Sequence, residues 1–141
     1  MRTILFATIL ALAATGCSKK ADKADSAEHQ SKVPTVTVDE LDKMLANNEC
    51  QPVDANGEGT RKKMGTIPGA VLLTDSDSFK PSELPADKAK TLVFYCANTS
   101  CGASHDAAGK AITAGHTNVK VLPDGIAGWV KAGKKTAPAG S

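Results

Sequence analysis

The segment 91–95, Thr-Leu-Val-Phe-Tyr, is followed directly by Cys96, and this junction constrains the fold more than any other feature of the chain. Five consecutive residues that are mostly β-branched, aromatic or apolar indicate a strand buried on both faces, as in a central parallel strand. After Cys96 the chain leads into a predicted helix over about 103–114, with Gly115 as its C-cap. In open α/β sheets, ligands bind beyond the carboxyl ends of the strands, which is where Cys96 is expected.

Strand and helix patterns alternate along the chain from residue 35. Further strands are predicted at 36–38 (an edge strand), 51–55, 70–73 and 119–122, and helices at about 39–48, 58–64, one turn within 82–90, and around Trp129. The capping-box pattern Thr37-Val38-Asp39-Glu40 marks the start of the first of these helices. The alternation predicts a three-layer α/β fold, a central parallel sheet of about five strands with helices on both faces.

Composition narrows the class of protein without naming an activity. The chain has 141 residues and a formal net charge of +2, which fits one domain with a tail and does not indicate a nucleic-acid partner. Aromatic residues make up 4% of the chain, so aliphatic side chains must fill most of the core, and four cysteines are too few for a disulfide scaffold. Composition excludes a coiled coil, a disordered protein and a polytopic membrane protein.

The first residues resemble a bacterial lipoprotein signal. Met1-Arg2 is a positive start, Ile4–Ala14 contains only apolar residues and Thr, and Ala14-Thr15-Gly16-Cys17 places small residues directly before a cysteine. A helix of this length spans about half a bilayer core, which predicts a signal-peptide core and not a membrane anchor. Residues 1–16 are therefore interpreted as a signal peptide and Cys17 as the lipidated N-terminus. The alternative is an ordinary secretory signal with a cysteine nearby by chance.

Residues 17–34 are small, charged and without apolar periodicity, which predicts a flexible tether between the lipid and a folded domain at 35–139. The protein is expected in the cell envelope, attached to the inner or outer membrane through the lipid and facing the periplasm. Export places its thiols in an oxidising compartment, where paired cysteines can form disulfides.

Cys96 is the candidate nucleophile. Between a strand and a helix, its thiol would lie among inward-facing backbone N–H groups and near the positive end of the helix dipole. Both effects favour the thiolate, which is the nucleophilic form of cysteine. Position alone is equally consistent with a buried structural cysteine, because unpaired cysteine is among the most buried residue types.

The segments around Cys96 are similar to the rhodanese family over about residues 35–134. The similarity is carried, in matching order and spacing, by Val53-Asp54, Gly65-Thr66-Ile67-Pro68-Gly69-Ala70, Val93-Phe94-Tyr95-Cys96, Gly115, Asn118-Val119, Leu122, Gly125-Ile126, Gly128-Trp129 and Ala132-Gly133. The G-x-I-P-G-A turn and the G-I-x-G-W ending are specific when they occur together around a cysteine that ends a strand. The resemblance implies a single-domain rhodanese-like fold.

The same resemblance implies a sulfurtransferase of the thiosulfate type. The Cys96 thiolate would take the outer sulfur of thiosulfate or polysulfide as a persulfide, and pass it to a small thiol, cyanide or a protein thiol, with no cofactor. Main-chain N–H groups of the active-site loop would stabilise negative charge on that sulfur. This loop comprises Ala97, Asn98, Thr99, Ser100, Cys101 and Gly102.

Three features depart from the family pattern. The loop carries no charged residue, so anion binding is assigned to Arg61, and the alternative is a solvated basic face of residues 61–63. Arg does not follow Asp54 by two residues, so an ion pair there is either absent or rebuilt. The chain between Cys96 and Asn118 is about two residues longer than usual, as in related phosphatases. Those phosphatases need Arg where Gly102 stands, so phosphate hydrolysis is not expected.

Cys101 leaves several interpretations open. It could approach Cys96 within disulfide range, which requires Cα atoms less than about 7 Å apart, and act as a resolving thiol. It could equally be a small buried residue at the start of the helix. A zinc site of Cys96, Cys101 and His105 has tolerable spacing but only three evident ligands, so no metal is expected. Cys50, before the second strand, is interpreted as structural.

Two other functions stay open beside the sulfurtransferase. The uncharged loop also fits a non-catalytic rhodanese-like module that binds a partner or a sulfur species at the cell envelope. A disulfide between Cys96 and Cys101 would also fit a thiol-redox protein that cycles this pair.

Overall fold

A sheet of four parallel strands forms the centre of the computed structural model, which describes residues 33–139. The strands are β1 (Gln51–Asp54), β2 (Val71–Leu72), β3 (Leu92–Tyr95) and β4 (Val119–Leu122), in the spatial order β2-β1-β3-β4. Every residue of β3 is buried, and β3 has a partner strand on each side. The apolar run at 91–95 is therefore a central parallel strand, as predicted.

The expected edge strand at 36–38 is reduced to a single parallel bridge between Thr35 and Val121. The Val36 N–H donates to the Val121 carbonyl at 2.9 Å, and the helix α2 (Val38–Ala46) begins two residues later. The capping box starts this helix early, because Thr37 N–H donates to the Glu40 carboxylate and Glu40 N–H donates to Thr37 Oγ1. The sheet consequently has four strands and not about five.

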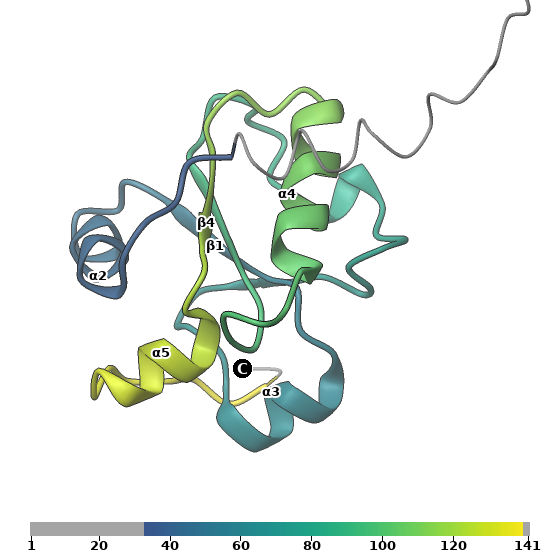
Figure 1. Ribbon diagram of the computed structural model, residues 1–141. Helices are drawn as coiled ribbons and strands as arrows, with labels where there is room; N and C mark the ends of the chain where they lie inside the picture. The colour runs from purple at the N-terminus through teal and green to yellow at the C-terminus, as the bar shows by residue number, and fades with distance from the viewer. Residues whose placement is uncertain (1–32, 140–141) are drawn as a thin grey trace, which may run out of the picture.

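Helices cover both faces of the sheet, as Figure 1 shows with α4 on one side and α2 on the other. The remaining helical elements are α3 (Glu58–Met64), the 3₁₀ turn η1 (Pro81–Glu83), α4 (Ala103–Thr113) and α5 (Gly125–Lys131). Side chains of β3 alternate between the faces: Phe94 packs with three alanines of α4, whereas Tyr95 packs with the α2 and α5 side. Trp129 of α5 is 3% exposed and anchors that second core cluster. The three-layer α/β prediction is confirmed.

The G-x-I-P-G-A turn connects α3 to β2 and is held from two sides. The Ile67 N–H donates to the Tyr95 hydroxyl at 3.0 Å, which ties the turn to the central strand. Thr66 exchanges backbone hydrogen bonds with Ala137 at 2.8 and 2.9 Å. Gly65 has φ +75°, and a Cβ atom there would lie 2.9 Å from the Ala137 carbonyl, so the close approach of the C-terminal segment requires glycine.

The predicted signal peptide at 1–16, Cys17 and nearly all of the tether at 17–34 lie outside the described residues. Between residues 33 and 139, no helix is long and apolar enough to cross a membrane.

Candidate active site

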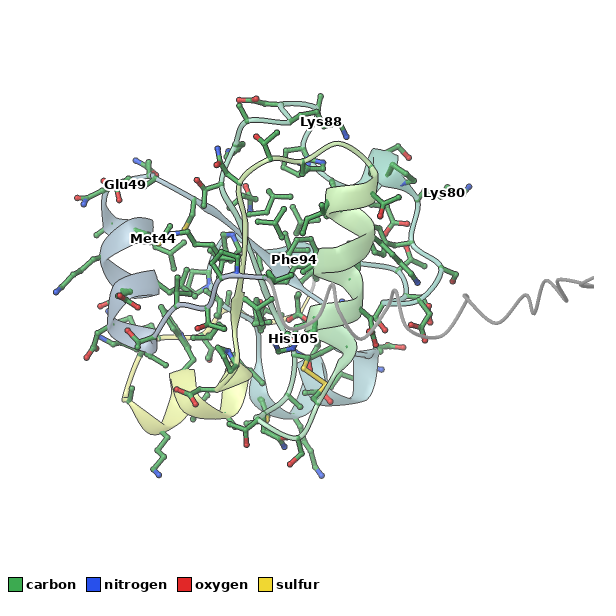
Figure 2. All side chains as sticks on the ribbon, turned by 45° about the horizontal axis from the view of Figure 1, so that its top comes forward. Met44, Glu49, Lys80, Lys88, Phe94 and His105 are labelled. Atoms are coloured by element: carbon green, nitrogen blue, oxygen red, sulfur yellow. A yellow bond between two sulfur atoms is a disulfide. The ribbon has the colours of Figure 1, made fainter. Side chains whose placement is uncertain are left out.

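Cys96 directly follows β3, and strand alternation decides where its side chain lies. Leu92, Phe94 and Cys96 share the face that packs against α4, and Phe94 is labelled between the sheet and this helix in Figure 2. Cys96 is 1% exposed, and its Sγ lies 3.5 Å from Oγ of Ser104, a buried residue in the first turn of α4. The sulfur therefore sits at the carboxyl end of the central strand, beside the N-terminus of an eleven-residue helix.

The first turn of α5 holds the backbone at Cys96. The Ile126 N–H donates to the Cys96 carbonyl at 2.8 Å, and the Ala127 N–H donates to the Ala97 carbonyl at 2.9 Å. Gly125 has φ +61°, and a Cβ atom at this position would lie 2.4 Å from the Cys96 carbonyl oxygen. The glycine that opens the G-I-x-G-W motif is thus required by the close approach of α5 to the cysteine loop.

Cys96 and Cys101 form a disulfide, with Cα atoms 6.3 Å apart. This distance is below the limit of about 7 Å that disulfide geometry sets for the two Cα atoms. Figure 2 shows the disulfide as a yellow bond at the end of the sheet where α4 begins. Neither sulfur is a free thiolate in this state. In the described part of the chain, no three or more His, Cys, Asp or Glu side chains are grouped so that they could hold a metal ion, and this covers Cys96, Cys101 and His105.

Two of the loop N–H groups that were expected to face the Cys96 sulfur donate elsewhere in this oxidised state. The N–H groups of Ser100 and Cys101 donate to the Asn98 side chain at 3.0 Å and the Asn98 carbonyl at 3.1 Å. The Cys101 carbonyl oxygen lies 3.1 Å from Cys96 Sγ. A carbonyl oxygen opposes negative charge on a neighbouring sulfur, so the loop must rearrange after reduction before Cys96 can be a stabilised thiolate.

The other loop residues are placed as a surface turn. Asn98, Thr99, Ser100 and Gly102 are exposed, and Ala97 and Cys101 are half-buried. The loop thus presents Cys101 nearer to solvent than Cys96, with no charged side chain among residues 97–102.

Arg61 lies at the same end of the sheet, where it forms an ion pair with buried Asp54 at the end of β1. Its Nε donates to Asp54 Oδ1 at 3.2 Å, and its Nη2 donates to the carbonyls of Asp54 and Leu73 at 3.0 and 2.8 Å. The ion pair that the sequence left as absent or rebuilt is therefore rebuilt from the helix α3. Arg61 is not part of a solvated basic face, whereas Lys62 and Lys63 are exposed. Nε and Nη2 of Arg61 already donate hydrogen bonds to protein oxygens, which leaves fewer donors for an anion. The role of Arg61 in anion binding stays a prediction.

Ser104 is the neighbour of Cys96 that the sequence analysis missed. A small hydroxyl residue eight positions after the cysteine, in the first turn of the following helix, was the available signal. Its hydroxyl can donate a hydrogen bond to a sulfur anion at position 96, which makes it a candidate for stabilising a thiolate or persulfide.

Cys50 lies at the opposite end of the sheet, immediately before β1. It is a free thiol that is 8% exposed. Burial, with a smaller contribution from the Glu49 carboxylate, raises the pKa of this thiol to about 11. The structural interpretation of Cys50 agrees with this environment, because a buried thiol with a raised pKa is unreactive.

Comparisons with known proteins show the same fold. A polysulfide-sulfur transferase homodimer from Wolinella succinogenes is 16% identical with a TM-score of 0.66, covering 84% of this chain and 88% of that protein. The human single-domain sulfurtransferase is 22% identical with a TM-score of 0.56, over 70% of this chain and 96% of its own. A protein of unknown function from Rhodopseudomonas palustris, described as a possible tyrosine phosphatase, is 24% identical with a TM-score of 0.63, over 88% and 99% of the two chains.

No match was found among curated proteins. The family model of the rhodanese-like domain matches residues 37–132, a span that contains every element from α2 to α5 and the Cys96 loop. This match covers more than half of the chain, and Cys96 ends the central strand of the expected fold. The chain therefore belongs to the rhodanese-like domain family.

Proposed function

We propose that this protein is a sulfurtransferase that moves sulfane sulfur from thiosulfate or a polysulfide through a persulfide on Cys96. The observation that carries the proposal is the position of Cys96, which lies at the carboxyl end of β3 and beside the N-terminus of α4. This position supplies helix-dipole stabilisation for a thiolate, and Ser104 supplies a hydroxyl 3.5 Å from the sulfur.

The reaction begins from the reduced form. The Cys96 thiolate attacks the outer sulfur of thiosulfate, the sulfur–sulfur bond of the donor breaks, and sulfite leaves with the bonding electron pair. The outer sulfur stays on Cys96 as a persulfide. This outer sulfur is then transferred to a small thiol, cyanide or a protein thiol, and the Cys96 thiolate is regenerated. The uncharged loop offers no ammonium or guanidinium group to a dianionic donor, so the donor is selected by its sulfur chemistry and by the helix terminus.

Intact mass spectrometry tests the proposal. Reduced, desalted protein carrying Cys101→Ser, which cannot re-form the disulfide, is incubated with thiosulfate or inorganic tetrasulfide, and a mass increase of about 32 Da, one sulfur atom, is expected. The increase is lost when Cys96→Ser is added to this variant and kept when the matched control Cys50→Ser is added. If no donor adds sulfur to protein whose Cys96 thiol is demonstrably free, the sulfurtransferase proposal is wrong.

The disulfide between Cys96 and Cys101 favours a second candidate, a thiol-redox protein that exchanges this pair with other proteins. The Cys101→Ser variant separates the two. A redox protein would recover its disulfide from oxidised glutathione in the wild-type chain, and its Cys101→Ser variant would take no sulfur from either donor.

We also propose that the protein is exported, lipid-anchored through Cys17 and faces the periplasm, the location that its N-terminal sequence favours. Metabolic labelling with a radioactive fatty acid should mark the wild-type chain and leave Cys17→Ser unlabelled. Equal labelling of Cys17→Ser and wild type would exclude this anchor.

A further inference from the structure

The disulfide places a second thiol in direct bonding contact with the atom that would carry the persulfide. Cys101 follows Cys96 by five positions, and its Sγ is bonded to the Cys96 Sγ, the inner sulfur of that persulfide. A nucleophile held in this position acts as an intramolecular reagent, which gives it an advantage of several orders of magnitude over a thiol in solution.

We propose that Cys101 completes the reaction inside the chain and that the product is hydrosulfide, so that the protein reduces sulfane sulfur with a dithiol as the electron donor. This inference rests on the proposed function, because it needs the Cys96 persulfide. The step regenerates the disulfide observed here.

The atoms and electrons of the step balance. The Cys101 thiol loses its proton and attacks Cys96 Sγ, and a bond forms between the two cysteine sulfurs. The bond from Cys96 Sγ to the outer sulfur breaks, and the outer sulfur leaves with the electron pair and the proton as hydrosulfide. Two cysteine thiols are oxidised to a disulfide, and one sulfane sulfur is reduced to the level of sulfide.

The exposure of the two sulfurs indicates how the enzyme is reset. Cys96 is 1% exposed, whereas Cys101 is half-buried in a loop whose neighbouring residues are exposed. An external thiolate therefore attacks Cys101 Sγ, and Cys96 leaves as a thiolate beside the Ser104 hydroxyl and the N-terminus of α4. The mixed disulfide on Cys101 is cleared by a second thiol of the same reductant, so the partner is a dithiol, and a dithiol protein fits this role.

A single-turnover experiment tests the inference on the full chain carrying Cys17→Ser, in three forms: otherwise wild type, Cys101→Ser and Cys96→Ser. Each is reduced, desalted without oxygen, and given one equivalent of thiosulfate or tetrasulfide. Free thiols are then alkylated, and the intact mass is measured. With thiosulfate, released sulfide is also measured. Neither thiosulfate nor the sulfite that leaves is itself sulfide, so any sulfide detected comes from the persulfide.

The otherwise wild-type chain should end as the disulfide, with the mass of the oxidised protein and, with thiosulfate, one hydrosulfide per chain. Cys101→Ser should keep the added sulfur on Cys96, with at least about tenfold more persulfide than the wild-type loop. Cys96→Ser should show neither product. Persulfide that persists equally with and without Cys101 would overturn the inference and leave the sulfurtransferase standing. Absence of added sulfur in Cys101→Ser with both donors would overturn the sulfurtransferase proposal itself.

Discussion

The two ends of the sheet each hold a buried cysteine, and the pair differs in almost everything except burial. Cys96 follows β3 and is 1% exposed, and Cys50 precedes β1 and is 8% exposed. Cys96 is bonded to a second cysteine five residues away, whereas Cys50 is free. Burial alone therefore does not decide which cysteine can react. The helix termini and polar groups around each sulfur also differ.

Parallel strands make the two ends unequal. At the carboxyl end the chain leaves β3 through a loop and enters α4, so Cys96 meets a helix N-terminus and the Ser104 hydroxyl. At the amino end the chain enters β1 after α2, so Cys50 lies in an apolar cluster beside the Glu49 carboxylate, both of which disfavour a thiolate. Lys90 and Lys120 act in the opposite direction, but more weakly.

The largest expected effect is on sulfur transfer. Cys96→Ser should lower turnover of any accepted donor by at least about 1000-fold, because the covalent intermediate cannot form. Cys50→Ser should change turnover less than about twofold, since its sulfur is at the far end of the sheet. Steady-state sulfite release from thiosulfate, with a small thiol as acceptor, measures both. Equal losses in the two variants would show that the two ends are not functionally distinct.

The second prediction distinguishes a structural role of Arg61, at the carboxyl end of the sheet, from a role in substrate binding. Arg61→Ala should lower the free energy of unfolding by about 4 kcal/mol, because it leaves the fully buried Asp54 carboxylate without its ion-pair partner. Lys62→Ala, which breaks an exposed pair with Glu58, should cost less than about 0.5 kcal/mol. Urea unfolding measures both variants. A stable Arg61→Ala protein with a raised KM for the donor would instead assign Arg61 to anion binding.

The sequence predicted the fold well because its signals are local. The apolar run at 91–95, the capping box at Thr37 and the helix after Cys96 are each set by neighbouring residues, and the structure confirms all three as a strand, a cap and a helix. The edge strand at 36–38 was wrong because two local signals competed for the same residues. The capping box starts α2 at Val38 and leaves only Thr35 to pair with the sheet.

The site was less predictable because its contacts depend on how loops and helices fold back onto the ends of the strands. Arg61 of α3 reaches back to Asp54 at the end of β1, and the spacing of the two residues does not reveal the pair. His116, between α4 and β4, is 2% exposed, with Nε2 lying 3.1 Å from Lys88 Nζ. Burial of this ring, followed by the charge of Lys88, lowers its pKa. Both contacts depend on tertiary packing, which a single sequence does not specify.

The third prediction compares a glycine at each end of the sheet. Gly125→Ala should cost about 3 kcal/mol, because its Cβ would lie 2.4 Å from the Cys96 carbonyl and its φ is +61°. Gly69→Ala, at the amino end, should cost only about 1 kcal/mol, because its φ is +77° but nothing lies within 4 Å of its Cβ position. Thermal or urea unfolding measures the difference. Equal costs would mean that α5 does not hold the cysteine loop tightly.

The smallest effect concerns the reactivity of Cys50 itself. Raising its pKa from 9.0 to about 11 lowers the thiolate fraction about 100-fold at pH 8. A raised thiol pKa disfavours the charged form, so alkylation by iodoacetamide should accelerate about tenfold per pH unit from pH 8 to 10, without a plateau below pH 10.

Peptide mass spectrometry of the native, oxidised protein follows Cys50, since Cys96 and Cys101 are protected by their disulfide. The same peptide in urea is the control and should react at the rate of an ordinary cysteine. A native rate that levels off by pH 9 would mean that the amino end of the sheet also supports a thiolate, and the contrast between the two ends would then rest on the Cys96 loop alone.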